Sequence, residues 1–158
     1  MHETIISTSV GRIYLAVEGR YLIALRNHTL PTDLASGTEE EQHTMQEVIC
    51  ELEEYLSGSR RSFGVMIRIG GTAFQQAVWQ AAMAVPYGRQ ATYTDIARSI
   101  GRPQAVRAVG QALGKNPILI IVPCHRIVGK NGIPRGYAGG AMLQAALLQI
   151  EARCHAIK

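Results

Sequence analysis

Cys124 directly precedes His125 and Arg126, a set of side chains suited to nucleophilic chemistry. The thiolate is the reactive form of cysteine, and nearby cationic groups lower the pKa of the thiol. An imidazole can also act as the base that removes the thiol proton. Because prolines and a glycine surround this segment, we predict that Cys124 is a nucleophile of lowered pKa in an irregular, exposed turn.

Two other readings of Cys124 stay open at this point, an inert core cysteine or half of a metal site. The chain has three cysteines, and no two of them have Cys-x-x-Cys spacing. Cys50 lies in a predicted helix and Cys154 near the C-terminal end, so neither shares the setting of Cys124. We therefore expect neither a metal nor a cofactor. An odd number of widely spread cysteines also excludes a disulfide-rich secreted scaffold.

The segment before the reactive cysteine predicts a helix-turn-helix. Thr92 or Thr94 begins a short helix that ends at Gly101, and Pro103 opens a second helix that runs to Gly114. An apolar stretch at 118–122 then predicts a buried strand that leads to Cys124. A helical hairpin in a core is the alternative interpretation. Basic residues around the turn and second helix favour DNA binding: Arg98, Arg102, Arg107 and Lys115.

The second helix has small residues on one side, at Ala105, Ala108 and Gly110. A slim helix of this kind suits a minor groove about 6 Å wide, whereas readers of the major groove carry long polar side chains. Close packing against another helix is the alternative explanation.

The distribution of charge points to a polyanionic partner. The net charge of +4 combines a net of −4 in residues 1–70 with a net of +8 in residues 71–158. Nucleic acid is the leading candidate for the basic half, with a solvated basic surface as the alternative. The longest apolar runs, of about five residues, are far too short for a membrane helix of about 20 residues. We expect a cytoplasmic protein that does not contact membranes.

Two domains are predicted, 1–70 and 71–158. The first is a small sheet with one helix, and a glycine- and arginine-rich linker at 57–71 separates it from the second, although residues 65–69 can add a strand. The second begins with a helix after Thr72 and ends with a helix that contains the apolar run 145–150. The predicted elements of the first domain are strands at 4–10, 12–17 and 21–25 and a helix from Thr38 to Gly58.

An ordered set of motifs in the second domain resembles the O6-alkylguanine-DNA alkyltransferases, also called methylated-DNA–protein-cysteine methyltransferases. The central motif is Pro-Cys-His-Arg at 123–126, preceded by Asn-Pro at 116–117 and followed by Gly-Tyr-Ala-Gly-Gly at 136–140. The resemblance covers roughly residues 71–151. Its other motifs are Phe-Gln-Gln-Ala-Val-Trp at 74–79, Val-Pro-Tyr-Gly at 85–88, Tyr-Thr-Asp-Ile-Ala at 93–97 and Arg-Ala-Val-Gly at 107–110.

The resemblance implies an α/β + α fold, with a small N-terminal ribonuclease H-like α/β domain and a C-terminal winged helix-turn-helix domain. It implies DNA repair by direct, irreversible and stoichiometric transfer of an alkyl group to Cys124. The donor would be O6-alkylguanine, or O4-alkylthymine, flipped out of double-stranded DNA from the minor groove. The protein would act as a cytoplasmic, single-turnover monomer.

The resemblance also assigns roles to single residues. His125 would act through a water as base toward Cys124, and Glu151, the only glutamate after Glu54, would orient the imidazole. The implied DNA contacts are Tyr93 at the target phosphate and base, Arg107 as the finger that fills the vacated space, and Ala105, Ala108, Gly110 and Arg126. In the base pocket, Tyr137 and the Ala138 N–H would act at the leaving oxygen, the carbonyls of Cys124 and Ile127 would accept from the guanine amino group, and Asn116 would join the recognition helix to the active-site turn.

Two departures from the family pattern stand out: Gln144, where a lysine or arginine is common, and Ala138, where serine is frequent.

Two rival functions remain. An alkyltransferase-like sensor binds lesions without repairing them, but such proteins lack the cysteine that is present here at position 124. A transcription regulator would use the helix-turn-helix in the major groove without cysteine chemistry.

Overall fold

The computed structural model describes residues 1–132 and 136–156, with side chains through residue 154. The chain divides into two compact units, Met1–Ile69 and Gly70–Lys158. The division falls one residue before the predicted position between residues 70 and 71. Among the described residues, no helix is both long and apolar enough to cross a membrane.

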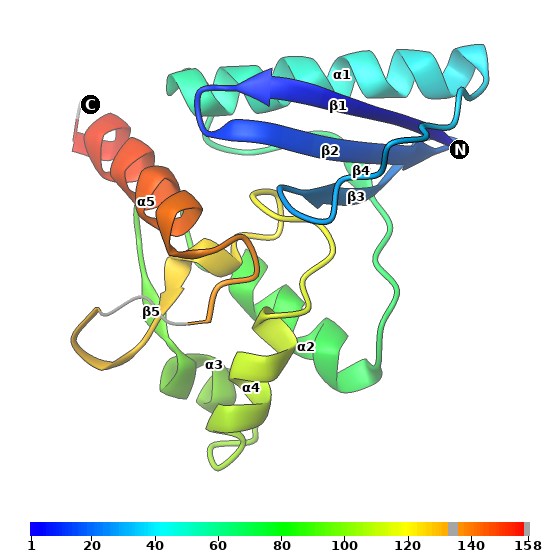
Figure 1. Ribbon diagram of the computed structural model, residues 1–158. Helices are drawn as coiled ribbons and strands as arrows, with labels where there is room; N and C mark the ends of the chain where they lie inside the picture. The colour runs from blue at the N-terminus through cyan, green and yellow to red at the C-terminus, as the bar shows by residue number, and fades with distance from the viewer. Residues whose placement is uncertain (133–135, 157–158) are drawn as a thin grey trace. The chain divides into compact units, whose positions relative to one another are not determined.

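The first unit is a four-stranded sheet with one helix packed along it (Figure 1). The first three strands form an antiparallel meander, and the short fourth strand pairs in parallel with the third. The predicted strands and helix are present, including the added strand in the linker, but the first strand ends at Thr8 and residues 9–10 form the turn. The elements are β1 (His2–Thr8), β2 (Gly11–Glu18), β3 (Tyr21–Arg26), α1 (Glu39–Ser57) and β4 (Met66–Ile67).

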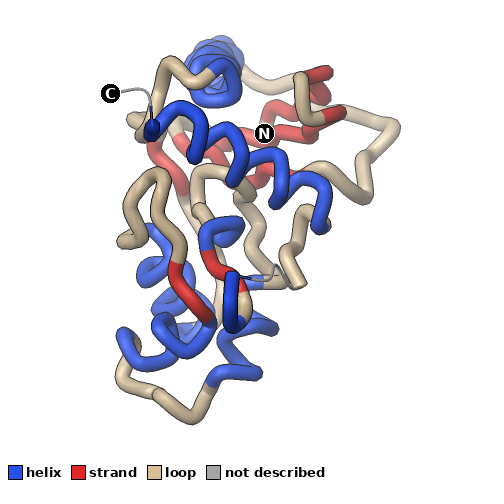
Figure 2. Tube along the Cα trace, turned by 90° about the vertical axis from the view of Figure 1, so that its left-hand side faces the viewer, coloured by secondary structure: helices blue, strands red, loops and turns tan. Residues whose placement is uncertain are grey.

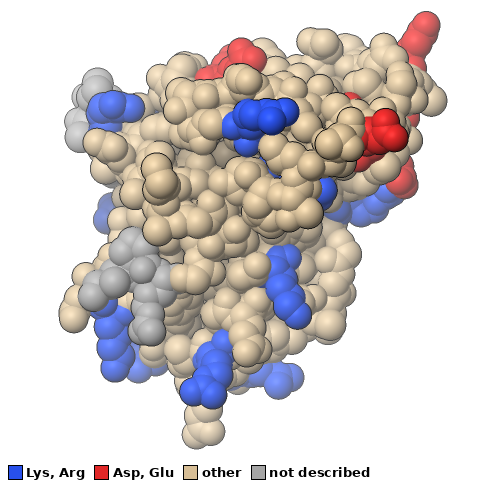
Figure 3. All heavy atoms as spheres, viewed as in Figure 1, with Lys and Arg blue, Asp and Glu red and all other residues tan. Residues whose placement is uncertain are grey.

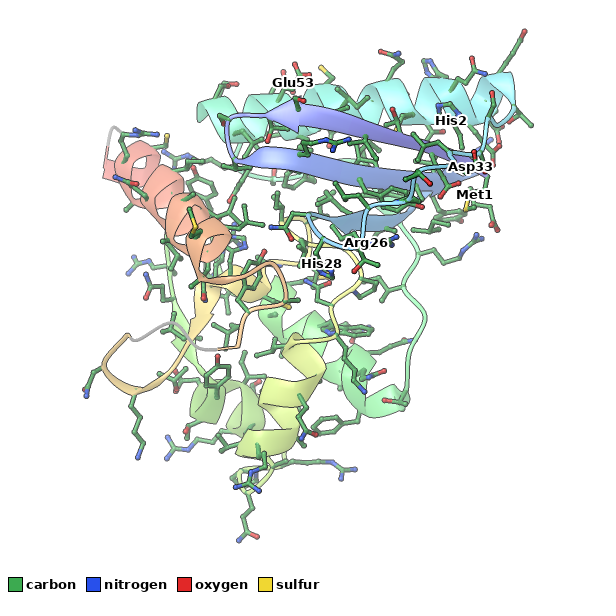
Figure 4. All side chains as sticks on the ribbon, viewed as in Figure 1. Met1, His2, Arg26, His28, Asp33 and Glu53 are labelled. Atoms are coloured by element: carbon green, nitrogen blue, oxygen red, sulfur yellow. The ribbon has the colours of Figure 1, made fainter. Side chains whose placement is uncertain are left out.

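Side-chain contacts fix the ends of these elements. Thr38 and Glu41 form a reciprocal capping box at the start of α1. At the end of β3, the Arg26 guanidinium donates to the carbonyl of His28 (Figure 4). The same guanidinium lies over the Tyr14 ring. These contacts hold the connection between β3 and α1 against the sheet.

The second unit is mainly helical, with one short parallel strand pair (Figure 2). Thr72 caps its first helix and Thr92 caps its second, as predicted. The elements are α2 (Ala73–Met83), β5 (Ala91–Thr92), α3 (Tyr93–Ser99), α4 (Val106–Leu113), the 3-10 helix η1 (Cys124–Arg126), β6 (Ile127–Val128), the 3-10 helix η2 (Lys130–Gly132) and α5 (Ala141–Ala156).

The helix-turn-helix of α3 and α4 is present, but its second helix begins later than predicted. Pro103 lies in a turn, which the Ala105 N–H closes on the carbonyl of Arg102 at 2.9 Å. Proline favours the second position of such a turn, and α4 begins only at Val106. The indole N–H of Trp79 donates to the carbonyl of Ala112 at 2.9 Å, which ties α4 to α2.

The predicted strand at 118–122 is wrong, although its burial is correct. These residues form consecutive turns, with Ile121 N–H bonded to Leu119 O and Val122 N–H bonded to Ile118 O. The Asn116 side chain accepts from the Ile118 N–H and donates to the Val122 carbonyl. Most of these backbone groups are therefore satisfied locally, and within this stretch only Ile118 takes part in an isolated β-bridge.

Candidate active site

The thiol of Cys124 is buried at the start of η1, with 2% of the residue exposed. The predicted exposed turn is therefore wrong, although the segment is irregular. Burial raises the pKa of Cys124 to about 12, and a hydrogen bond with the Asn116 side chain opposes this rise only in part. The predicted lowering of the pKa of Cys124 is also wrong, because burial dominates. The side chains of His125 and Arg126 are bonded to Glu151 instead.

Glu151 on α5 is the centre of the polar contacts around the cysteine. Its Oε2 lies 2.8 Å from His125 Nε2 and accepts from Arg126 Nη2 at 2.9 Å. Its Oε1 accepts from Arg126 Nε at 2.9 Å and from the Gly88 N–H at 3.3 Å. Arg126 also donates to the carbonyl of Val85 at 2.8 Å. One carboxylate, 1% exposed, thus joins α5, η1 and the turn after α2.

The environment keeps His125 neutral. Burial lowers the pKa of His125, and the positive charge of Arg126 lowers it further, while Glu151 acts in the opposite direction. Because a carboxylate only accepts hydrogen bonds, the neutral ring carries its proton on Nε2. Nδ1 then holds the lone pair that can receive a proton.

The structure corrects the prediction that Arg126 contacts DNA. Arg126 is only 7% exposed, and its guanidinium is bonded to Glu151 and the Val85 carbonyl. The charge of Arg126 compensates the buried carboxylate of Glu151, so its guanidinium is not available to contact DNA.

Asn116 and Tyr137 both lie close to the Cys124–His125 segment. Asn116 follows α4 and binds the turns that lead to Cys124, so it links the recognition helix to the nucleophile. Tyr137 is buried with its ring 6.3 Å from that of His125, and among the described residues its hydroxyl has no hydrogen-bond partner. Burial raises the pKa of Tyr137, so the phenol remains a donor. A side chain on Gly139 would meet the Tyr137 ring at 2.7 Å.

The recognition helix presents Arg107 and Ala108 to solvent, with Ala105 and Gly110 half-buried. A Cβ on Gly110 would meet nothing within 4 Å, so packing inside the chain does not require a glycine there. Close helix packing therefore does not explain the small residue at this position.

A hollow of about 650 Å³ lies beside the recognition helix. Tyr93 and Val106 line it on one side, and the segment at 129–131 lines it on the other. Arg98, Arg102, Arg107 and Lys115 are exposed in and next to the helix-turn-helix, and Figure 3 shows basic side chains spread over the second unit. No group of three or more His, Cys, Asp or Glu side chains among residues 1–132 and 136–154 could hold a metal ion.

Comparisons with known proteins agree with this geometry. The family model described as 6-O-methylguanine DNA methyltransferase, DNA binding domain, matches residues 73–153, and the model of the ribonuclease-like domain of the same protein matches residues 1–69. The inducible methylated-DNA–protein-cysteine methyltransferase of Bacillus subtilis is 40% identical over 149 residues, which cover 94% of this chain and 83% of the relative. The chain belongs to the 6-O-methylguanine DNA methyltransferase family.

Other relatives match over nearly the full length. The methylated-DNA–protein-cysteine methyltransferase of Methanosarcina acetivorans is 39% identical over 156 residues, covering 98% of this chain and all of the relative. The crystal structure of Mycobacterium tuberculosis OGT in complex with DNA has a TM-score of 0.88 at 38% identity, and the match covers 98% of this chain and 94% of that one. The two-domain fold implied by the resemblance is thereby confirmed.

Three residues of this methyltransferase site make contacts that the sequence interpretation did not predict. Val85 and Gly88 bind the Arg126–Glu151 pair, and Gln144, buried on α5, donates to the carbonyls of His125 and Ile127. The Val-Pro-Tyr-Gly motif at 85–88 predicted a turn but not the hydrogen bonds of that turn to Arg126 and Glu151. Gln144 stood out as a departure from the family pattern on the helix that supports the guanine pocket, but its contacts were not predicted.

The raised pKa of Cys124 predicts a loss of stability at alkaline pH. The unfolded chain loses the thiol proton near pH 9, whereas the folded chain retains it up to about pH 12. The folded state binds the extra proton in this window, so the free energy of unfolding falls by up to about 1.4 kcal/mol per pH unit. Between pH 8 and pH 10, wild type should lose about 1 kcal/mol more than Cys124→Ala in urea unfolding.

The exposed Cys50 offers a matched control. Cys50→Ala should show the same alkaline loss as wild type. An equal loss in wild type and Cys124→Ala would contradict the raised pKa.

Proposed function

We propose that this protein repairs DNA by moving an alkyl group from O6 of guanine, or O4 of thymine, to Sγ of Cys124. The family comprises methyltransferases that act on methylated DNA and a protein cysteine. The observation that carries the assignment to Cys124 is the His125–Glu151 pair beside it, at 2.8 Å. Cys50 lies exposed on α1, and Cys154 lies near the end of α5.

In the proposed reaction, His125 Nδ1 takes the thiol proton through a water, and Glu151 stabilises the imidazolium. The thiolate attacks the alkyl carbon, an S–C bond forms and the C–O6 bond breaks. The bonding electrons pass to the oxygen, toward which Tyr137 and the Ala138 N–H donate hydrogen bonds. The purine regains a proton from solvent, and the imidazolium returns one. The product thioether has no route back to a thiol, so each molecule reacts once.

A thiol with 2% of its residue exposed cannot reach a base that is stacked in a duplex. We therefore infer that the damaged nucleotide leaves the stack, with Arg107 filling the space and Tyr93 contacting the phosphate and base. Ala105, Ala108 and Gly110 provide clearance for the minor groove. The carbonyls of Cys124 and Ile127 accept from the guanine amino group. We propose that the protein works as a monomer in the cytoplasm.

Cys124→Ala should abolish transfer and leave binding to alkylated DNA intact, because the side chain supplies the nucleophile and not the phosphate contacts. After incubation with a duplex containing O6-methylguanine, intact mass should rise by about 14 Da, once, in wild type. Cys50→Ala and Cys154→Ala should gain the same mass. Label on Cys50 or Cys154 would contradict the assignment, and a regulator or a sensor would gain no mass at all.

Arg107→Ala should slow repair of duplex DNA by about tenfold or more but leave reaction with free O6-benzylguanine within about twofold, because a free base needs no flipping. Arg20→Ala, at an exposed position in the first unit, is the matched control and should change neither rate. Equal losses on the two substrates would show that Arg107 is not a finger.

A further inference from the structure

Gln144 is a buried polar residue that the reaction scheme above does not use. It is 1% exposed, and its side-chain amide donates to the carbonyl of His125 at 3.2 Å and to the carbonyl of Ile127 at 3.3 Å. Both acceptors lie within three residues of the nucleophile. A three-residue 3-10 helix leaves its last carbonyls without partners of its own, and Gln144 satisfies them from α5.

Gln144 and Glu151 lie seven residues apart, two helical turns, and therefore share one side of α5. Leu147 lies between them and is fully buried. Glu151 holds the side chains of η1, while Gln144 holds the backbone that leaves η1. The same face of α5 thus fixes both the base and the peptide groups next to the cysteine.

The peptide groups of Ile127 connect Gln144 to the base pocket. The Ile127 N–H donates to the carbonyl of Cys124, and the Ile127 carbonyl accepts from Gln144. Each of these carbonyls has a second lone pair. In the proposed function these two carbonyls receive the guanine amino group, so their direction decides how well that group is bound.

We propose that Gln144 is a specificity-determining positioning residue, which aims the Ile127 carbonyl at the exocyclic amino group of the flipped guanine. This inference rests on the proposed function. The side-chain amide of Gln144 carries two donor hydrogens, so it can satisfy both buried carbonyls at once. Gln144 acts through Ile127 and touches no reacting atom.

The test compares two lesions that differ only in the amino group, O6-methylguanine and O6-methylhypoxanthine, each at the same place in one duplex. Single-turnover methyl transfer is measured for wild type, Gln144→Leu and Gln144→Lys. Leucine removes both donors, so transfer from O6-methylguanine should slow by about tenfold, the size of one hydrogen bond. Transfer from O6-methylhypoxanthine should slow by less than about twofold. Lysine, which restores a donor, should keep the wild-type ratio within about twofold.

Gln149→Leu on the exposed side of α5 is the matched control and should leave both rates unchanged. If Gln144→Leu does not fold, Gln144→Met removes the donors with a more adaptable side chain and gives the same comparison. Equal slowing on both lesions, or an unchanged ratio, would overturn the specificity role. A wild-type protein that transfers no methyl group from either lesion would instead contradict the proposed function.

Discussion

The second unit is organised around a single buried carboxylate. Glu151 accepts hydrogen bonds from His125, from two nitrogens of Arg126 and from the backbone of Gly88. A buried ion pair adds little net stability, but removal of one partner leaves an uncompensated charge at a cost of about 3–5 kcal/mol. The helix α5, the cysteine segment and the turn after α2 are therefore constrained to meet at this point. The position of the nucleophile follows from that constraint.

The same arrangement gives the neighbouring residues His125 and Arg126 different roles. Arg126 compensates Glu151 and helps to lower the pKa of His125, so the imidazole is neutral and ready to accept a proton. Cys124 remains a protonated thiol, because burial raises its pKa to about 12. A protein that reacts only once benefits from a thiol that is unreactive until substrate arrives, since exposed thiolates are the cysteines most easily oxidised.

Local patterns in the sequence predicted the elements well, because capping residues and periodic apolar positions act over a few residues. Thr38, Thr72 and Thr92 each start the expected helix. The errors arose where local turns replaced the expected regular structure. Asn116 converts the apolar stretch at 118–122 into turns, and the turn at Pro103 delays α4. Periodicity carries no signal for either effect.

The residue types of the site were also predictable, but their partners were not. The structure brings His125, Arg126 and Glu151, which the sequence singled out, into one cluster beside Cys124. The direction of Arg126 and the pKa of Cys124 depend on burial that only the folded chain defines. Gly88 and Gln144 contribute a backbone N–H and an amide, groups that almost any turn or helix offers. Their importance comes from position alone.

The most direct measurement is the pH dependence of methyl transfer in wild type and Glu151→Gln. If Glu151 supports His125 as the base, the neutral amide should lower the maximal rate by at least about tenfold. It should also move the acid limb to lower pH, because the carboxylate that raises the pKa of His125 is gone. An unchanged rate and an unchanged profile, in a protein that is still folded, would contradict the account and leave Glu151 as the structural partner of Arg126 alone.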